Sequence, residues 1–131
     1  MSAHSSGLPA AVLGTGQTHH VSRRTDVSMA GLCREAIDAA MADAGVGWDD
    51  IDAVIVGKAP DLFEGVMMPE LMMADALGAV GKPLLRVHTA GSVGGSTAIV
   101  AAAQIGRAVQ QECRDRPNNL VCRLLLEKNF F

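Results

Sequence analysis

The sequence predicts an α/β fold with a mostly parallel sheet and crossover helices. Short apolar runs, typical of buried parallel strands, alternate along the chain with longer segments of helical periodicity. The chain has 131 residues, of which 49% are hydrophobic and 14 are glycine, and this composition suits one compact domain. The order strand, helix, strand, helix, strand, helix is the one that parallel sheets with right-handed crossovers produce. We expect three or four strands and three main helices.

The N-terminal part of the chain predicts a leader followed by a strand. Residues 1–9 combine serine, histidine, glycine and proline, so we expect them to be flexible. The continuous apolar run over residues 10–14 predicts a buried parallel strand. Gly14 and Gly16 begin a turn, but His19 stands where a dinucleotide-binding loop needs its third glycine. We therefore expect a solvated loop here and no nucleotide cofactor.

The next segment predicts a helix from Met29 to Ala44. Its apolar residues recur at the spacing of one buried helix face, N-cap candidates precede it at 26–28, and Gly45 is placed to end it. Cys33 lies on the apolar face, where we expect a small buried hydrophobe; a reactive thiol is the alternative. The three cysteines of the chain form no CxxC pair, which favours a reduced, cytoplasmic setting.

Two elements follow in the middle of the chain. The apolar run over residues 51–57 predicts a second strand. Residues 69–77 predict a short helix that opens with a proline and is closed by Gly78 and Gly81. Methionines at 67, 68, 72 and 73 are expected to form a core or subunit contact, and an adaptable apolar surface is the alternative.

The stretch over residues 83–98 predicts the junction around which the chain is organised. A third strand over 84–88 runs into a tight Gly/Ser turn over Gly91–Gly95, and a helix from Gly95 to Glu112 follows. Backbone N–H groups and the positive end of a helix dipole meet at such a turn, which suits an anion or a developing oxyanion. We therefore expect the ligand site at this turn.

The composition excludes several classes of function. The net charge is −3, and the chain has one tryptophan, three phenylalanines and no tyrosine, so we expect no nucleic-acid partner. No run approaches the ~20 apolar residues that span a bilayer, so we expect no membrane span. Histidines, cysteines and carboxylates do not cluster at ligand spacing, so we expect no metal.

Four pieces of the sequence, in their order and spacing, resemble the N-terminal part of the thiolase superfamily. The resemblance is to its lipid-transfer-protein-like branch, related to the thiolase part of sterol carrier protein. In this family a nucleophilic cysteine lies at the strand-to-helix turn, where this chain has Gly91. The matching pieces are Ala11–Gly16, Glu35-Ala36 with Asp43–Gly45, Asp50–Val54 with Gly57, and His88–Gly95.

The resemblance implies a thiolase-like lipid-transfer protein, or one related to acetyl-CoA acetyltransferase, that acts on acyl-coenzyme A thioesters in lipid or sterol metabolism. It implies a homodimer, no cofactor besides the coenzyme A of the substrate and, as in some family members, a small OB-fold partner. Because Gly91 has no thiol, the acyl-cysteine intermediate cannot form there, and we expect no complete active site. A non-catalytic acyl-CoA or lipid-binding module and a subunit-interaction piece of a thiolase-like aldolase complex are the alternatives.

The resemblance also divides the chain and names its site. Residues 10–106 form the partial thiolase-like domain, and residues 107–131 are an atypical tail that suggests a truncated or frame-shifted gene product. Within that tail, residues 120–126 are a candidate fourth strand. For His88 and Ser92 the alternatives are a satisfied strand-end histidine and a turn or cap serine. The implied substrate-binding residues are His88, Gly91, Ser92, Gly94 and Gly95.

Overall fold

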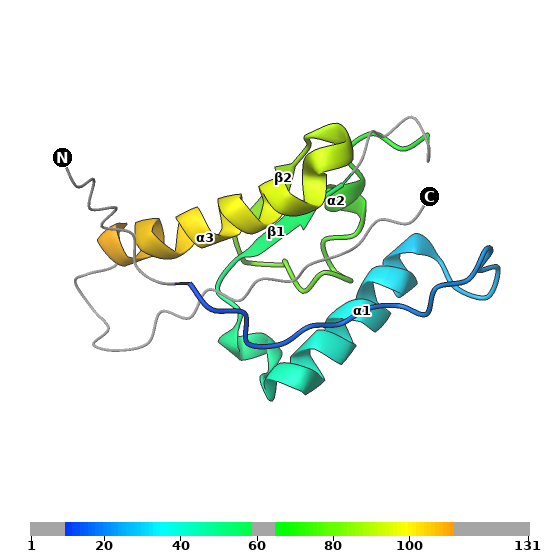
Figure 1. The fold of residues 1–131 in the computed structure, drawn as a ribbon, viewed down its shortest axis with the longest axis horizontal. Coiled ribbons are helices and arrows are strands. Elements are labelled where there is room, and N and C mark those ends of the chain that lie inside the picture. Colours follow the sequence, from blue (N-terminus) through cyan, green and yellow to red (C-terminus); the bar gives the residue numbers. More distant parts are fainter. Residues whose placement is uncertain (1–9, 59–64, 112–131) are drawn as a thin grey trace.

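The computed structural model describes residues 10–58 and 65–111, which form a mixed α/β arrangement (Figure 1). Two helices, α1 and α3, lie on opposite sides of a small parallel sheet. The leader 1–9 and the candidate strand 120–126 lie outside the described residues, and the predicted boundary at residue 106 falls within α3. The elements in order are α1 (Met29–Ala44), a 3₁₀ turn (Trp48–Asp50), β1 (Val54–Gly57), α2 (Pro69–Met72), β2 (Leu84–Val87), a second 3₁₀ turn (Ala90–Ser92) and α3 (Val93–Gln111).

Helix α1 confirms the prediction at both ends. The Ser28 hydroxyl accepts a hydrogen bond from the Gly31 N–H at 3.1 Å, which satisfies one of the free donors of the first turn. At the other end Gly45 adopts a left-handed conformation with φ 66°. The N–H groups of Gly45 and Val46 donate to the carbonyls of Ala42 and Met41, the pair of bonds that satisfies a helix C-terminus.

The sheet of the described residues has two parallel strands, β1 and β2, in a register that runs from Val54 opposite Leu84 to Gly57 opposite Val87. The Val54 N–H donates to the Pro83 carbonyl at 2.9 Å, and the Lys58 N–H donates to the Val87 carbonyl at 3.2 Å. Because the strands are parallel, their carboxyl ends meet at one edge. Both strands are shorter than predicted, and the sheet of the described residues is smaller than the three or four strands expected.

The predicted strand over residues 10–14 is wrong, because these residues form no strand in the structure. The segment instead lies against α1. A Cβ added to Gly14 would stand 2.6 Å from the Ala40 carbonyl oxygen, and the Thr15 N–H donates to the Asp43 carboxylate at 2.9 Å. The apolar run is not buried as predicted either, since Val12 and Leu13 are 56% and 48% exposed.

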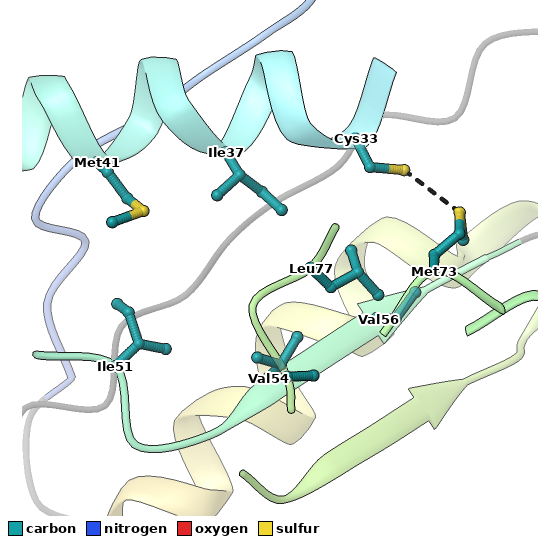
Figure 2. Packing of buried hydrophobic residues seen from close by; sticks show 9 residues of the cluster. Cys33, Ile37, Met41, Ile51, Val54, Val56, Met73 and Leu77 are labelled. Atoms are coloured by element: carbon teal, nitrogen blue, oxygen red, sulfur yellow. Dashed lines mark hydrogen bonds between the residues drawn. The ribbon is translucent and has the colours of Figure 1, made fainter. Parts of the chain in front are cut away.

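The main hydrophobic core lies between α1 and β1 and includes the segment after α2 (Figure 2). Cys33 is 1% exposed, which confirms the buried hydrophobe, and its thiol contacts the Met73 sulfur at 3.7 Å. Side chains at alternate β1 positions, Val54 and Val56, face this core, as the two-residue period of a strand requires. The buried members are Cys33, Ile37, Met41, Ile51, Val54, Val56, Met73, Leu77 and Ala79.

A second contact joins the other face of the sheet to α3. Gly57 lies so close to Thr97 that an added Cβ would overlap the Thr97 hydroxyl oxygen. Thr97 is itself 3% exposed and satisfies its hydroxyl by donating to the Val93 carbonyl at 2.7 Å. Glycine at the last β1 position therefore lets α3 approach the strand closely. Within the described ranges, no helix is both long and apolar enough to cross a membrane.

Helix α2 begins at the predicted proline but is shorter than the predicted 69–77. It ends at Met72, and turns that close at Gly78, with φ 64°, complete the segment. The expected core role of the methionines is only partly correct. Met73 is 4% exposed, whereas Met67, Met68 and Met72 are largely exposed. One short segment thus contributes both to the core and to an apolar surface.

Candidate functional site

The candidate site is the junction between β2 and α3, which we define as residues 88–95. After β2, the Thr89 carbonyl accepts two hydrogen bonds from Ser92, one from its N–H at 3.1 Å and one from its hydroxyl at 2.8 Å. The Val93 N–H then donates to the Ala90 carbonyl. These bonds close a 3₁₀ turn that leads directly into α3.

This local closure corrects the predicted start of the helix. We expected a turn over Gly91–Gly95 and a helix from Gly95, but α3 begins at Val93. Gly94 and Gly95 therefore belong to the first helical turn. The helix begins earlier because the bonds of Ser92 and Val93 already wind the chain into helical pitch.

Backbone strain marks the centre of the junction. Ala90 has φ 47°, a left-handed conformation that costs an L-residue with a Cβ roughly 1–2 kcal/mol. Strained backbone of this kind concentrates at functional sites, where the surrounding structure holds it in place. The strained residue here carries only a methyl group, so the junction presents backbone more than side chain.

The glycines of the junction face open space. A Cβ added at Gly91, Gly94 or Gly95 would meet nothing within 4 Å. All three are exposed, as are His88 and Ser92, so the five predicted residues lie together on the surface. None of these glycines is required by packing or by a positive φ. Their effect is to leave the peptide groups at the start of α3 accessible.

Ser92 is engaged in the turn itself. Its hydroxyl donates to the Thr89 carbonyl, which is the bond expected of a turn residue. A serine nucleophile would need a base to receive that proton, whereas here the proton is held by a backbone carbonyl. The junction therefore offers donors and open space more than a nucleophile.

Sequence reasoning missed three charged residues near this edge of the sheet. Lys58 directly follows β1 and is 4% exposed. On β2, Arg86 forms an ion pair with Glu70 of α2 at 3.3 Å, and the two side chains are 17% and 13% exposed. The available signal was a basic residue directly after one apolar strand pattern, Lys58, and another inside the next, Arg86, because burial of such a charge requires a partner.

A second ionic cluster orients the loop before α1. The Arg24 guanidinium donates to Asp26 at 2.9 Å and to Glu35 at 3.1 Å. The hydrogen bond from Arg24 lowers the pKa of the Asp26 carboxyl, and the two carboxylates raise the pKa of Arg24. The Asp26 and Glu35 side chains are 66% and 43% exposed, so the cluster fixes loop geometry more than it adds stability.

Two apolar cavities lie away from the junction. One, of about 30 Å³, lies between α1 and β1 and is lined by residues that include Cys33, Ile37 and Val56. The other, of about 190 Å³, lies between residues 10–12 and the middle of α3. Neither has a lining residue from 88–95. Among residues 10–58 and 65–111, no group of three or more histidine, cysteine or acidic side chains is placed to hold a metal ion.

Comparison with models of known protein families and with curated proteins gives no match for this chain. The thiolase resemblance therefore stays a prediction carried by the four sequence pieces.

Proposed function

We propose that this chain is a thiolase-like protein that binds acyl-coenzyme A thioesters of lipid or sterol metabolism without forming an acyl-enzyme. The open, strained junction between β2 and α3 is the observation that carries the proposal. It lies at the carboxyl edge of a parallel sheet, the edge at which open α/β sheets bind their ligands. The resemblance places the family's reacting cysteine at Gly91, within this junction.

The chemistry of a thioester suits such a junction. Its carbonyl oxygen accepts hydrogen bonds, and the first turn of a helix offers N–H donors together with the positive end of the dipole. Because Gly91 and Gly94 carry no side chain and have open space around them, a ligand can approach the backbone closely. The same donors would favour any negative charge that the ligand carries.

Covalent acyl transfer is not part of the proposal. Residue 91 has no nucleophilic atom, and the Ser92 hydroxyl donates to the Thr89 carbonyl. Binding at the junction can therefore polarise a thioester carbonyl without breaking the thioester bond. Turnover of acetoacetyl-CoA or of a steroid enoyl-CoA by the pure chain above background would contradict this part of the proposal.

Titration calorimetry with a long-chain or steroid acyl-CoA tests the binding. We expect saturable, roughly one-to-one binding, which Gly94→Asp weakens at least about tenfold because it places a carboxylate among the donors. The matched control is Ser28→Asp, which adds the same charge at the N-terminus of α1, where aspartate caps as well as serine. The proposal fails if a chain that circular dichroism shows to be folded releases no heat, or if both variants weaken binding equally.

A subunit-interaction piece is the second candidate, and the outer edge of β2 favours it. The N–H groups of Val54 and Lys58 donate to the carbonyls of Pro83 and Val87. Because backbone groups alternate in direction along a strand, those of Leu84 and Arg86 point toward the other edge. Leu85 on the same strand is 40% exposed. Concentration-dependent dimerisation in sedimentation experiments, without acyl-CoA binding, would support this candidate. The homodimer and a small OB-fold partner remain parts of the proposal that the resemblance implies.

A further inference from the structure

The residues just before α2 and within it expose four apolar side chains to solvent. We define the methionine surface as Met67, Met68, Leu71 and Met72, which are 83%, 55%, 61% and 72% exposed. These four residues fall within six consecutive positions and include no charge. Exposed apolar groups gathered in this way mark binding sites more often than isolated ones do.

Buried and ion-paired residues of the same segment hold the methionine surface toward solvent. Pro69 is fully buried, Met73 packs against Cys33, and Glu70 pairs with Arg86. Met68 has φ 53° and ψ 54°, a left-handed conformation that methionine adopts only at a cost. The buried Pro69 directly follows Met68 and anchors the chain on that side, which holds Met68 at the surface.

The methionine surface lies at the same edge of the sheet as the junction. Arg86, which holds Glu70 of α2, is followed by the last residue of β2, and the junction begins at His88. Figure 1 shows α2 and the start of α3 at the same end of the strands. Within the junction, Val93 is the one large apolar side chain and it is half-buried, so the junction has little apolar surface of its own.

We propose that the methionine surface is the acyl-chain subsite of the junction. This inference rests on the proposed function, and it assigns the hydrocarbon part of the ligand to Met67, Met68, Leu71 and Met72. A thioester whose carbonyl lies at the donors of α3 must extend its alkyl chain over a neighbouring surface. Unbranched thioether side chains adjust to alkyl chains of different length and shape. Because the four side chains of the methionine surface carry no charge, they offer no group that would select a polar ligand.

The test is the dependence of affinity on acyl-chain length. Each methylene that becomes fully buried raises affinity roughly fourfold, and partial burial against a surface gives about twofold. For the wild-type chain we therefore expect octanoyl-CoA to bind at least about tenfold more tightly than acetyl-CoA. In the double variant Met67→Gln/Met72→Gln that gain falls below about threefold. Both residues are highly exposed, so the polar side chains leave the core unchanged.

The control variant is Val80→Gln, since Val80 is 70% exposed but precedes β2 at the opposite edge of the sheet. It should keep the wild-type gain with chain length. Equal affinity for acetyl-CoA and octanoyl-CoA in the wild type would overturn the subsite while leaving the proposed function standing. Absence of binding by every acyl-CoA overturns both. Loss of self-association in the double variant, with its chain-length gain retained, would assign the surface to contact with a second copy and overturn the subsite.

Discussion

Glycines occur in two regions of this molecule for opposite reasons. In the packed region, around α1 and the sheet, Gly57 leaves room for Thr97, and a Cβ on Gly16 would overlap the Ala36 carbonyl oxygen. In the junction, Gly91 and Gly94 have no neighbour within 4 Å of an added Cβ. The packed glycines allow close approach within the protein, whereas the junction glycines leave a surface open to something outside it.

The packed glycines therefore matter for folding stability, whereas the junction glycines matter for the access of a ligand. Side chains fill the packed region, and any added volume must displace backbone or a buried hydroxyl. Added volume in the junction meets solvent, so its cost to folding is small and its effect on a ligand is large. Substitutions that compare the two regions directly can therefore break or sharpen this interpretation.

The largest effect should come from the core side of the comparison. Ile37, 6% exposed, packs between α1 and β1, and Ile37→Ala removes three buried carbons and leaves a cavity. We expect about 3 kcal/mol of lost unfolding free energy in urea titrations. Ile99→Ala on α3 is the control, since Ile99 is 73% exposed and should change stability by less than about 0.5 kcal/mol. Equal losses would show that the described core is not the one that stabilises the chain.

Alanine at two glycines should change stability with opposite signs. Gly57→Ala forces Thr97 away from β1, and we expect a loss of about 1–3 kcal/mol. Gly94→Ala lies in the first turn of α3 with open space around it, so higher helix propensity should add up to about 1 kcal/mol. Chemical denaturation measures both. The double variant Gly57→Ala/Thr97→Ala should recover part of the loss, and an additive result would contradict a direct overlap.

Two serines that hold turns should differ by a smaller amount. Ser28→Ala removes the N-cap of α1 and should cost about 1 kcal/mol. Ser92→Ala removes one of two bonds to the Thr89 carbonyl on the exposed junction, so the N–H bond of residue 92 remains and the cost should stay below about 0.5 kcal/mol. Thermal unfolding of the two variants gives the comparison, and a larger loss for Ser92→Ala would make the junction the more rigid region.

The smallest effect is expected in the loop before α1, where Arg24 pairs with Asp26 and Glu35. Arg24 lowers the folded-state pKa of Asp26, so the pair stabilises the fold above the unfolded-state pKa of that carboxyl and loses its effect as pH falls through the folded-state pKa. The difference in unfolding free energy between wild type and Asp26→Asn should therefore be greatest near neutral pH and shrink in acid. A difference that grows as pH falls would have the wrong sign for this pair.

Local patterns predicted the elements whose causes are local. Helix α1 was predicted with both ends because its apolar period, its serine cap and its terminal glycine are all contained in the sequence segment itself. The strand over residues 10–14 could not be settled in the same way, since an apolar run does not state whether its partner is a strand or a helix. In the structure this segment contacts α1, because Gly14 closely approaches Ala40.

The same distinction between local and tertiary causes applies to the candidate site. The sequence located the strand-to-helix turn and its glycines, because glycine and serine are local signals of a turn. It did not predict the left-handed Ala90, because alanine is not a residue that favours a positive φ. It also did not predict the pairing of Arg86 with Glu70, because the two residues are sixteen positions apart and their contact depends on which parts of the chain meet.

By itself, the sequence determined the mixed α/β class, α1 with its caps, the order of the elements from α1 onward and the place of the junction, because each follows from periodicity or residue chemistry within a few positions. Only the tertiary structure decided which apolar residues are buried. Met72 and Met73 are neighbours of identical chemistry, yet one is 72% exposed and the other 4%. The reason is physical: burial depends on what a side chain packs against, and Met73 meets Cys33 of α1, forty residues earlier in the chain.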